Sequence, residues 1–236
     1  MISRIIKSTV CNKNLLTNSS KAILNNPLFK INKMNFSAKD NLINCFQQEL
    51  EYEEKEYKPL SEEEKSTIYQ NNGFEFIESK SSAKMQLKKT VNDYVVDIHY
   101  FARSPLGEDE EEQNNEQGES PNNVTDIQIL IYKQGQSNGF FVNAMIIDSK
   151  VNINTIQVSD NVQEYNQKYS SGLVEPDVYQ GPDFYTLDEN LKQAFSDFMY
   201  ELGINEECSS FIEYTSLQKD HSLYINWLKN AKNVLL

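Results

Sequence analysis

The sequence predicts an α+β protein with a single, strongly twisted antiparallel sheet of about seven strands and helices at both ends of the chain. Apolar residues alternate with a period of two between about residues 73 and 158, whereas they follow helical spacing before residue 57 and after residue 186. Most segments between the alternating runs are short and rich in Asn, Gly and Ser, and none contains the helix that a parallel crossover needs. We therefore expect an antiparallel meander, with an N-terminal helix and two C-terminal helices packed on one face.

The first 38 residues differ in composition from the rest of the chain. They contain six basic residues and no acidic one, and they are rich in Ser, Thr and Asn. A basic segment of this kind, without the compact apolar core of a secretory signal, is typical of a mitochondrial transit peptide. We expect residues 1–38 to be cleaved and residues 39–236 to form one domain. The alternative is a basic disordered tail that is not cleaved.

A short amphipathic helix is predicted from about Asp40 to Glu56, ending before Pro59. Its apolar positions are Leu42, Ile43, Phe46 and Leu50. Its polar face is mostly glutamate and includes Glu49, Glu51, Glu53 and Glu54.

Strands follow from Gly73 onward. Their apolar residues are Phe74 and Phe76, then Met85 and Leu87, then Tyr94 to Tyr100, Ile127 to Ile131, Val142 to Ile146, and Val151 with Ile153. Residues 94–101 and 127–132 are apolar or aromatic on both faces, which indicates central strands that are covered on each side.

An acidic segment, residues 104–123, separates the third and fourth of these runs. Its seven acids are Glu108, Asp109, Glu110, Glu111, Glu112, Glu116 and Glu119. Low hydrophobicity and charge of one sign predict disorder, because too little apolar surface is available to offset the loss of chain entropy. The spacing of a calcium-binding loop is missing, and whether the acids bind Ca²⁺ stays open. A second polar segment, residues 161–175, is also expected to be a loop.

Two helices are predicted at the C-terminus. The first runs from about Leu187 to Leu202, with Thr186 and Glu189 as a capping box and Gly203 just past its end. The second begins after Asn205 and keeps helical spacing to the end of the chain. We expect its aromatic side chains to be buried, with the ring of Trp227 filling the seam against another helix. The residues expected to serve helix packing and assembly are Phe46, Leu50, Leu217, Tyr224, Ile225, Trp227 and Leu228.

The C-terminal segment carries a family resemblance. The motif YQGPDFYTLDENL, a helix ending in ELGI and the closing YINWLKNAKNVL resemble the mitochondrial acidic matrix protein family, also called the mitochondrial glycoprotein family. Complement component 1 Q-subcomponent-binding protein is its animal member. The resemblance is good from Tyr179 to Leu236 and extends, as a pattern of strands and one early helix, over residues 40–158. It implies a homotrimeric ring in the mitochondrial matrix, with roles in mitochondrial translation and oxidative phosphorylation and no catalytic motif.

No pattern typical of an enzyme occurs in the sequence. The two histidines, His99 and His221, are far apart, and no glycine-rich phosphate-binding loop is present. Cys45 and Cys208 lack metal-binding spacing and are expected to be buried as small apolar side chains. No apolar run reaches the 18 residues of a membrane span. We expect no catalytic residue, cofactor or metal.

The charge of the chain points to basic protein partners. Loss of residues 1–38 would remove six of the 22 basic residues and none of the 35 acidic ones, so the net charge would change from −13 to −19. Such a surface repels nucleic acid, and direct binding to it is not expected. The sequence favours a non-enzymatic scaffold or chaperone-like protein that holds basic clients through the loop acids and the helix glutamates. The alternative is a permanent structural subunit of a large assembly, such as a respiratory-chain complex or the mitoribosome.

Overall fold

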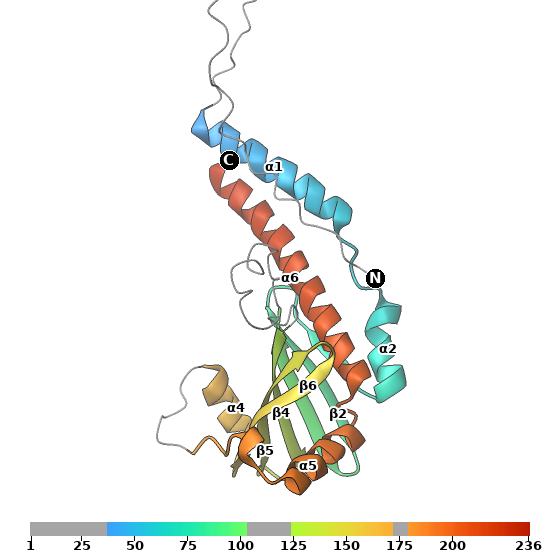
Figure 1. Ribbon diagram of the computed structural model, residues 1–236. Coiled ribbons are helices and arrows are strands. Elements are labelled where there is room, and N and C mark those ends of the chain that lie inside the picture. The colour runs from blue at the N-terminus through green and yellow to red at the C-terminus, as the bar shows by residue number, and fades with distance from the viewer. Residues whose placement is uncertain (1–36, 103–123, 172–178) are drawn as a thin grey trace, which may run out of the picture.

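The computed structural model describes residues 37–102, 124–171 and 179–236 of the chain (Figure 1). The predicted transit peptide, apart from its last two residues, and the predicted acidic loop lie outside these ranges. The described helices are α1 (Ala38–Glu56), α2 (Glu62–Asn72), α4 (Val162–Ser170), the short 3₁₀ helix η1 (Phe184–Thr186), α5 (Glu189–Glu201) and α6 (Glu206–Leu235). The described strands are β1 (Glu75–Glu78), β2 (Lys84–Val91), β3 (Tyr94–Phe101), β4 (Val124–Lys133), β5 (Gly139–Ile147) and β6 (Lys150–Ser159).

The strands form one antiparallel sheet in the order in which they occur in the chain, which confirms the α+β class and the meander. The sheet has six strands among the described residues, so the prediction of about seven was slightly too high. After β6, Asp183 makes a single antiparallel bridge to Thr155. Pro182 beside it has no N–H to extend the ladder, and Gly181 takes a positive φ of 85°.

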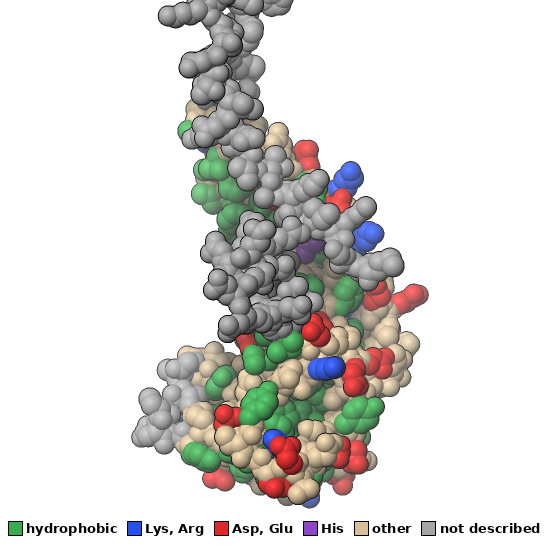
Figure 2. Space-filling view, in the orientation of Figure 1, with side chains coloured by type: hydrophobic (Ala, Val, Ile, Leu, Met, Phe, Trp, Pro, Cys, Tyr) green, Lys and Arg blue, Asp and Glu red, His purple; other side chains and the backbone are tan. Residues whose placement is uncertain are grey.

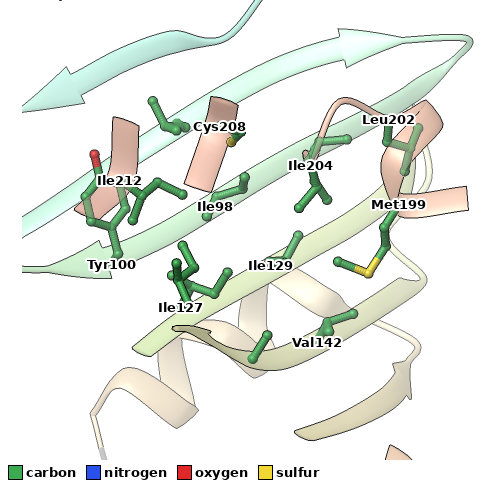
Figure 3. Close-up of a cluster of buried hydrophobic side chains, with 14 of the residues drawn as sticks. Ile98, Tyr100, Ile127, Ile129, Val142, Met199, Leu202, Ile204, Cys208 and Ile212 are labelled. Carbon is green, nitrogen blue, oxygen red and sulfur yellow. The ribbon is translucent and has the colours of Figure 1, made fainter. Parts of the chain in front are cut away.

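The main core lies between the sheet and the helices α2, α5 and α6. β3 and β4 are central, as predicted, and their inward side chains meet those of the helices (Figure 3). Residues of this core include Ile98, Tyr100, Ile127, Ile129, Val142, Met199, Leu202, Ile204, Cys208 and Ile212. The buried hydroxyl of Tyr100 lies 2.8 Å from Oγ1 of Thr215, which ties the first half of α6 to the central strand.

The opposite face of the sheet is covered in part by α4, so the prediction that the helices pack on one face was incomplete. The segment after Asn161, predicted to be a loop, forms this helix because Asn161 caps it and Val162 and Tyr165 share an apolar side. These two residues pack on Val95, Leu130, Tyr132 and Phe141 of the sheet. Figure 1 shows α4 at a different side of the sheet from α5 and α6.

Helix caps explain most of the boundaries. Ser37 and Asp40 form a capping box at α1, and Ser61 and Glu64 form another at α2, a helix for which the apolar pattern gave no signal. Asn205 caps α6, as predicted, and accepts a hydrogen bond of 3.0 Å from the backbone N–H of Cys208. At α5 the predicted capping box was wrong. Asp188 is the cap residue, because Thr186 still belongs to η1.

The second half of α6 extends beyond the sheet and is paired with α1 (Figure 1). α1 therefore packs on another helix rather than on the sheet. No helix among the described residues is long and apolar enough to cross a membrane.

Candidate interaction surface

α1 and the second half of α6 pack against each other in antiparallel orientation. We call this helix pair the hairpin, although the two helices are not consecutive and the sheet lies between them in the sequence. Its centre is a small apolar cluster in which Leu50 of α1 packs against Ile225 and Leu228 of α6, with Phe46 and Tyr57 at its border. Phe46, Leu50, Ile225 and Leu228, which were expected to serve helix packing and assembly, lie in or beside this cluster, and their role in assembly stays a prediction. Leu217, also predicted to pack, is partly buried nearer the sheet.

Polar contacts run along both helices beside this cluster. The carboxylate of Glu53 lies 2.7 Å from the imidazole of His221, and that of Glu54 lies 2.7 Å from the ammonium group of Lys229. The Tyr224 hydroxyl donates a hydrogen bond of 3.2 Å to Glu49. Lys232 also donates to the side-chain oxygen of Gln47. The glutamates predicted on the polar face of α1 thus lie largely along its border with α6.

These contacts decide which of the predicted α1 glutamates a client protein can reach. The side chain of Glu53 is only 12% exposed, and its carboxylate faces His221 within the hairpin. Glu49 and Glu54 remain exposed while contacting α6, and Glu51 accepts a hydrogen bond of 2.6 Å from Gln47 on its own helix. Of the four α1 glutamates predicted to hold clients, Glu49, Glu51 and Glu54 are therefore those that a client could reach. The seven loop acids lie outside the described residues, and their role stays a prediction.

Tyr224 stays a neutral hydrogen-bond donor at this border. Partial burial and the nearby carboxylates of Glu49 and Glu53 raise the pKa of its hydroxyl to about 12. At the pH of any cellular compartment the phenol keeps its proton, so the contact with Glu49 persists.

One side of the hairpin is apolar and exposed. We name this surface the hairpin strip and define it as Leu42, Phe46, Tyr224, Trp227 and Val234. Trp227 meets Phe46 edge to face at a ring-centroid distance of 5.9 Å and stacks on Tyr224, yet it is 56% exposed. The ring thus lies against another helix, as expected, but this contact leaves more than half of it exposed. A pair of helices cannot cover the whole apolar surface of either helix, so the hairpin strip stays exposed. Val234, at the end of the strip, is 84% exposed. Figure 2 shows hydrophobic side chains gathered along the hairpin.

Each histidine is paired with an acid. His221 lies against Glu53, and His99 lies 3.1 Å from Asp97 within β3. Sequence reasoning missed Asp97, although an acid between Val96 and Ile98 in a strand covered on both sides is a signal of a buried carboxylate. Burial alone would raise the pKa of Asp97, but the hydrogen bond and charge of His99, together with Gln86, hold it below its usual value.

The thiols differ from each other. Cys208 is buried as predicted, and burial raises the pKa of its thiol to about 12, so it is inert. Cys45 is exposed on α1, against the prediction, because it lies on the side of the helix away from α6. Across residues 37–102, 124–171 and 179–236 no three His, Cys, Asp or Glu side chains are placed to hold a metal ion.

Comparison with known proteins gives one family and several relatives. The family model described as mitochondrial glycoprotein matches residues 46–235. Mitochondrial acidic protein mam33 of Schizosaccharomyces pombe is 40% identical over 57 residues, which cover 24% of this chain and 21% of that protein. An uncharacterized mitochondrial protein of Arabidopsis thaliana is 38% identical over 56 residues, 24% of this chain and 22% of that protein. The matched segment thus spans about a fifth of each relative.

Solved structures share the fold at low sequence identity. The Trypanosoma brucei p22 protein superposes with a TM-score of 0.61 and 15% identity over 84% of this chain and 98% of its own. A Leishmania major protein, titled a sequence homologue of human p32 protein, gives a TM-score of 0.65 and 16% identity over 85% of this chain and 100% of its own. These matches agree with a sheet flanked by an N-terminal helix and C-terminal helices.

Proposed function

Because the chain belongs to the mitochondrial glycoprotein family, we propose that it is a non-enzymatic, acidic, homotrimeric scaffold or chaperone-like protein of the mitochondrial matrix. In this role it holds basic segments of client proteins and supports mitochondrial translation and oxidative phosphorylation. The relatives named mitochondrial, in a fungus and a plant, support a mitochondrial location, and the matrix is part of the proposal.

The observation that carries the proposal is the excess of acids in the chain after the predicted transit peptide. All 35 acidic residues follow residue 39, whereas six of the 22 basic residues precede it. Exposed pairs of opposite charge contribute only ~0–1 kcal/mol each, so a client would be held by many contacts together and no single acid would be essential. Association driven by such charges is fast and weakens as salt screens them.

Trimer formation needs a surface that compensates for the repulsion between three acidic chains. The hairpin strip provides apolar side chains that one chain alone leaves exposed, including Trp227 at 56% and Leu42 at 45%. Burial of such groups between chains is favourable by about 25 cal/mol per Å² of apolar surface. We therefore assign the hairpin strip to the contact between copies of the chain.

A binding experiment tests the client role. The full chain and a variant with the seven loop acids replaced by Ser and Asn are titrated with a basic peptide at low and high salt. The proposal expects weaker binding and a smaller salt dependence for the variant, with an unchanged melting temperature. Affinity that is indifferent to both salt and the loop acids would contradict the electrostatic mechanism.

The second candidate is a permanent structural subunit of a respiratory-chain complex or the mitoribosome. It is favoured by the same exposed strip, because a fixed neighbour could cover it instead of another copy. Native-mass fractionation of mitochondria separates the two functions. A free assembly of three chains supports the scaffold, whereas complete co-migration with a megadalton complex supports the subunit.

A further inference from the structure

In the part of the chain that the structure describes, the first half of β6 forms an open edge of the sheet. β6 ends the strand order, so only its inner side is paired, with β5. Within the described residues, Thr155 is the one position of β6 with a bridge partner elsewhere, at Asp183. The outer backbone N–H and C=O groups between Lys150 and Asn154 therefore face no strand of the described chain. An exposed edge of this kind is a template for an added strand.

A hollow opens beside this edge on the helix-covered face. We name it the β6 hollow and define it by its lining residues Val151, Ile153, Ser196, Met199, Tyr200 and Ile204. It is open to the surface and has a volume of about 220 Å³ between β6, the end of α5 and the start of α6. Pockets for drug-sized ligands are larger, at ~300–1,000 Å³, so this one suits a single side chain. Val151, Ile153, Met199 and Ile204 form the apolar part of the lining. The polar part consists of Lys150, Glu206, Ser149, Ser196, Asn205 and Ser209.

The edge and the hollow fit one extended peptide. Side chains of a strand alternate between the two faces of a sheet. Every second side chain of a strand added to β6 would therefore point to the helix-covered face, where the hollow lies. Backbone hydrogen bonds would hold such a segment, and one anchor in the hollow would select it.

The surroundings favour a basic segment. The stretches that line the hollow, residues 148–153 and 196–209, carry one base, Lys150. Of their five exposed acids, Glu206 lines the hollow together with Lys150, and Asp148, Asp197, Glu201 and Glu207 are close to lining residues in the sequence. Figure 2 shows more acidic than basic side chains around hydrophobic ones on this lower part of the molecule. A peptide with positive charges beside its anchor matches that distribution.

We propose that an extended basic segment of a client protein adds to the open edge of β6 and inserts one apolar side chain into the β6 hollow. The inference rests on the proposed function, because it takes the clients to be basic protein segments. It adds a recognition rule, namely an apolar anchor flanked by basic residues, to binding that charge alone would leave unselective.

Fluorescence anisotropy with the full chain tests the rule. The probes are two short labelled peptides rich in arginine, one with a central leucine and one with serine in its place. We expect the leucine peptide to bind about tenfold more tightly or better, as burial of a large apolar side chain implies. Methylation of backbone nitrogens on one edge of the leucine peptide should abolish this advantage, because those N–H groups would pair with β6.

Two protein variants locate the effect. Ser196→Phe fills the hollow from an exposed position of α5, and Ser210→Phe places the same ring at an exposed position of α6 outside the lining. S196F should remove the preference for leucine, whereas S210F should keep it within about twofold of the unmodified protein, since its ring lies outside the lining. Sedimentation velocity checks that both variants keep the same assembly.

Each other outcome overturns one statement. Equal binding of the two peptides, or an S196F protein that still prefers leucine, refutes the β6 hollow as an anchor site but leaves salt-dependent binding of basic peptides intact. Absence of any binding at low salt refutes the proposed function itself. If S196F alone changes the sedimentation coefficient, the hollow holds a second copy of the chain, and the client site proposed here is wrong.

Discussion

At the scale of single residues, Asp97 shows how a buried charge is kept in the sheet. Its carboxylate is nearly enclosed and is held by His99 at 3.1 Å and Gln86 at 2.7 Å. Asp97→Asn removes the charge that pairs with His99, and we expect it to lower the free energy of unfolding by ~1–3 kcal/mol at pH 7. Urea unfolding measures this loss.

The pH dependence of the same variant has a defined sign. The pKa of Asp97 is lower in the folded chain than its ordinary value of 3.8, so its ionised form contributes stability above that pH. This contribution is lost as the pH falls through the lower, folded pKa. The stability difference between the two proteins should therefore shrink as the pH falls below about 4. A difference that persists unchanged in acid would contradict the role of the charge.

Gly181 offers a second prediction at this scale. A Cβ there would lie 2.0 Å from the backbone oxygen of Ile156, and the residue has a φ of 85°. Gly135 has a similar φ of 82° but no atom within 4 Å of a built Cβ. Gly135→Ala should cost ~1–2 kcal/mol for its backbone alone, and Gly181→Ala should cost more because β6 must also move. Thermal unfolding compares the two, and equal losses would show that the approach to β6 is not tight.

At the scale of elements, the hairpin can be weakened without disturbing the sheet. Leu228 is 2% exposed and belongs to a cluster of only three buried residues, which is separate from the main core. Leu228→Ala should therefore destabilise the contact of α1 with α6 by ~2–4 kcal/mol. Hydrogen exchange should become faster in α1 and in the second half of α6 but stay unchanged in β3 and β4.

Val234→Ala is the matched control for this change. Val234 lies on the same half of α6 but is 84% exposed, so its truncation should leave exchange in a single chain unaltered. Faster exchange of β3 and β4 in the Leu228 variant would mean that hairpin and sheet unfold as one unit.

The elements also show what the sequence could predict. The period of two located all six described strands, and helical spacing located α1, α5 and α6, because one buried face imposes its period on the sequence. Of the predicted N-terminal caps, only Asn205 of α6 was correct. α2 and α4 were missed because each buries few residues, with Ile68 as the one fully buried side chain of α2. Their caps at Ser61 and Asn161 were the available signals.

The candidate surface was predictable only in part. Helical spacing identified Leu50, Ile225 and Leu228 as apolar packing positions, but it could not tell which side of an apolar stripe the second helix covers, so the exposure of Trp227 was not predicted. The β6 hollow is formed by residues from separate elements and has no signature in the sequence. Only the order of the strands and the end of α5 bring Ile153 and Met199 together.

At the scale of the whole molecule, the proposed trimer makes a direct prediction about the hairpin strip. Trp227→Ser removes a ring that is 56% exposed in one chain, so the stability of that chain should change little, whereas the contact between copies should weaken strongly. Sedimentation velocity should show a shift toward single chains. Tyr69→Ser, which removes an exposed ring of α2, should leave the assembly intact. An unchanged sedimentation coefficient for the Trp227 variant would remove the strip from the contact.

The consecutive strand order also has a kinetic consequence. Each strand pairs with its neighbour along the chain, so the sheet can grow by successive hairpins, and only the loops within them must close. The contact of α1 with α6 joins residues near both ends of the described chain and closes a far longer loop. We expect substitutions at the contact of α1 with α6 to accelerate unfolding with little effect on the folding rate, because these two helices meet after the transition state.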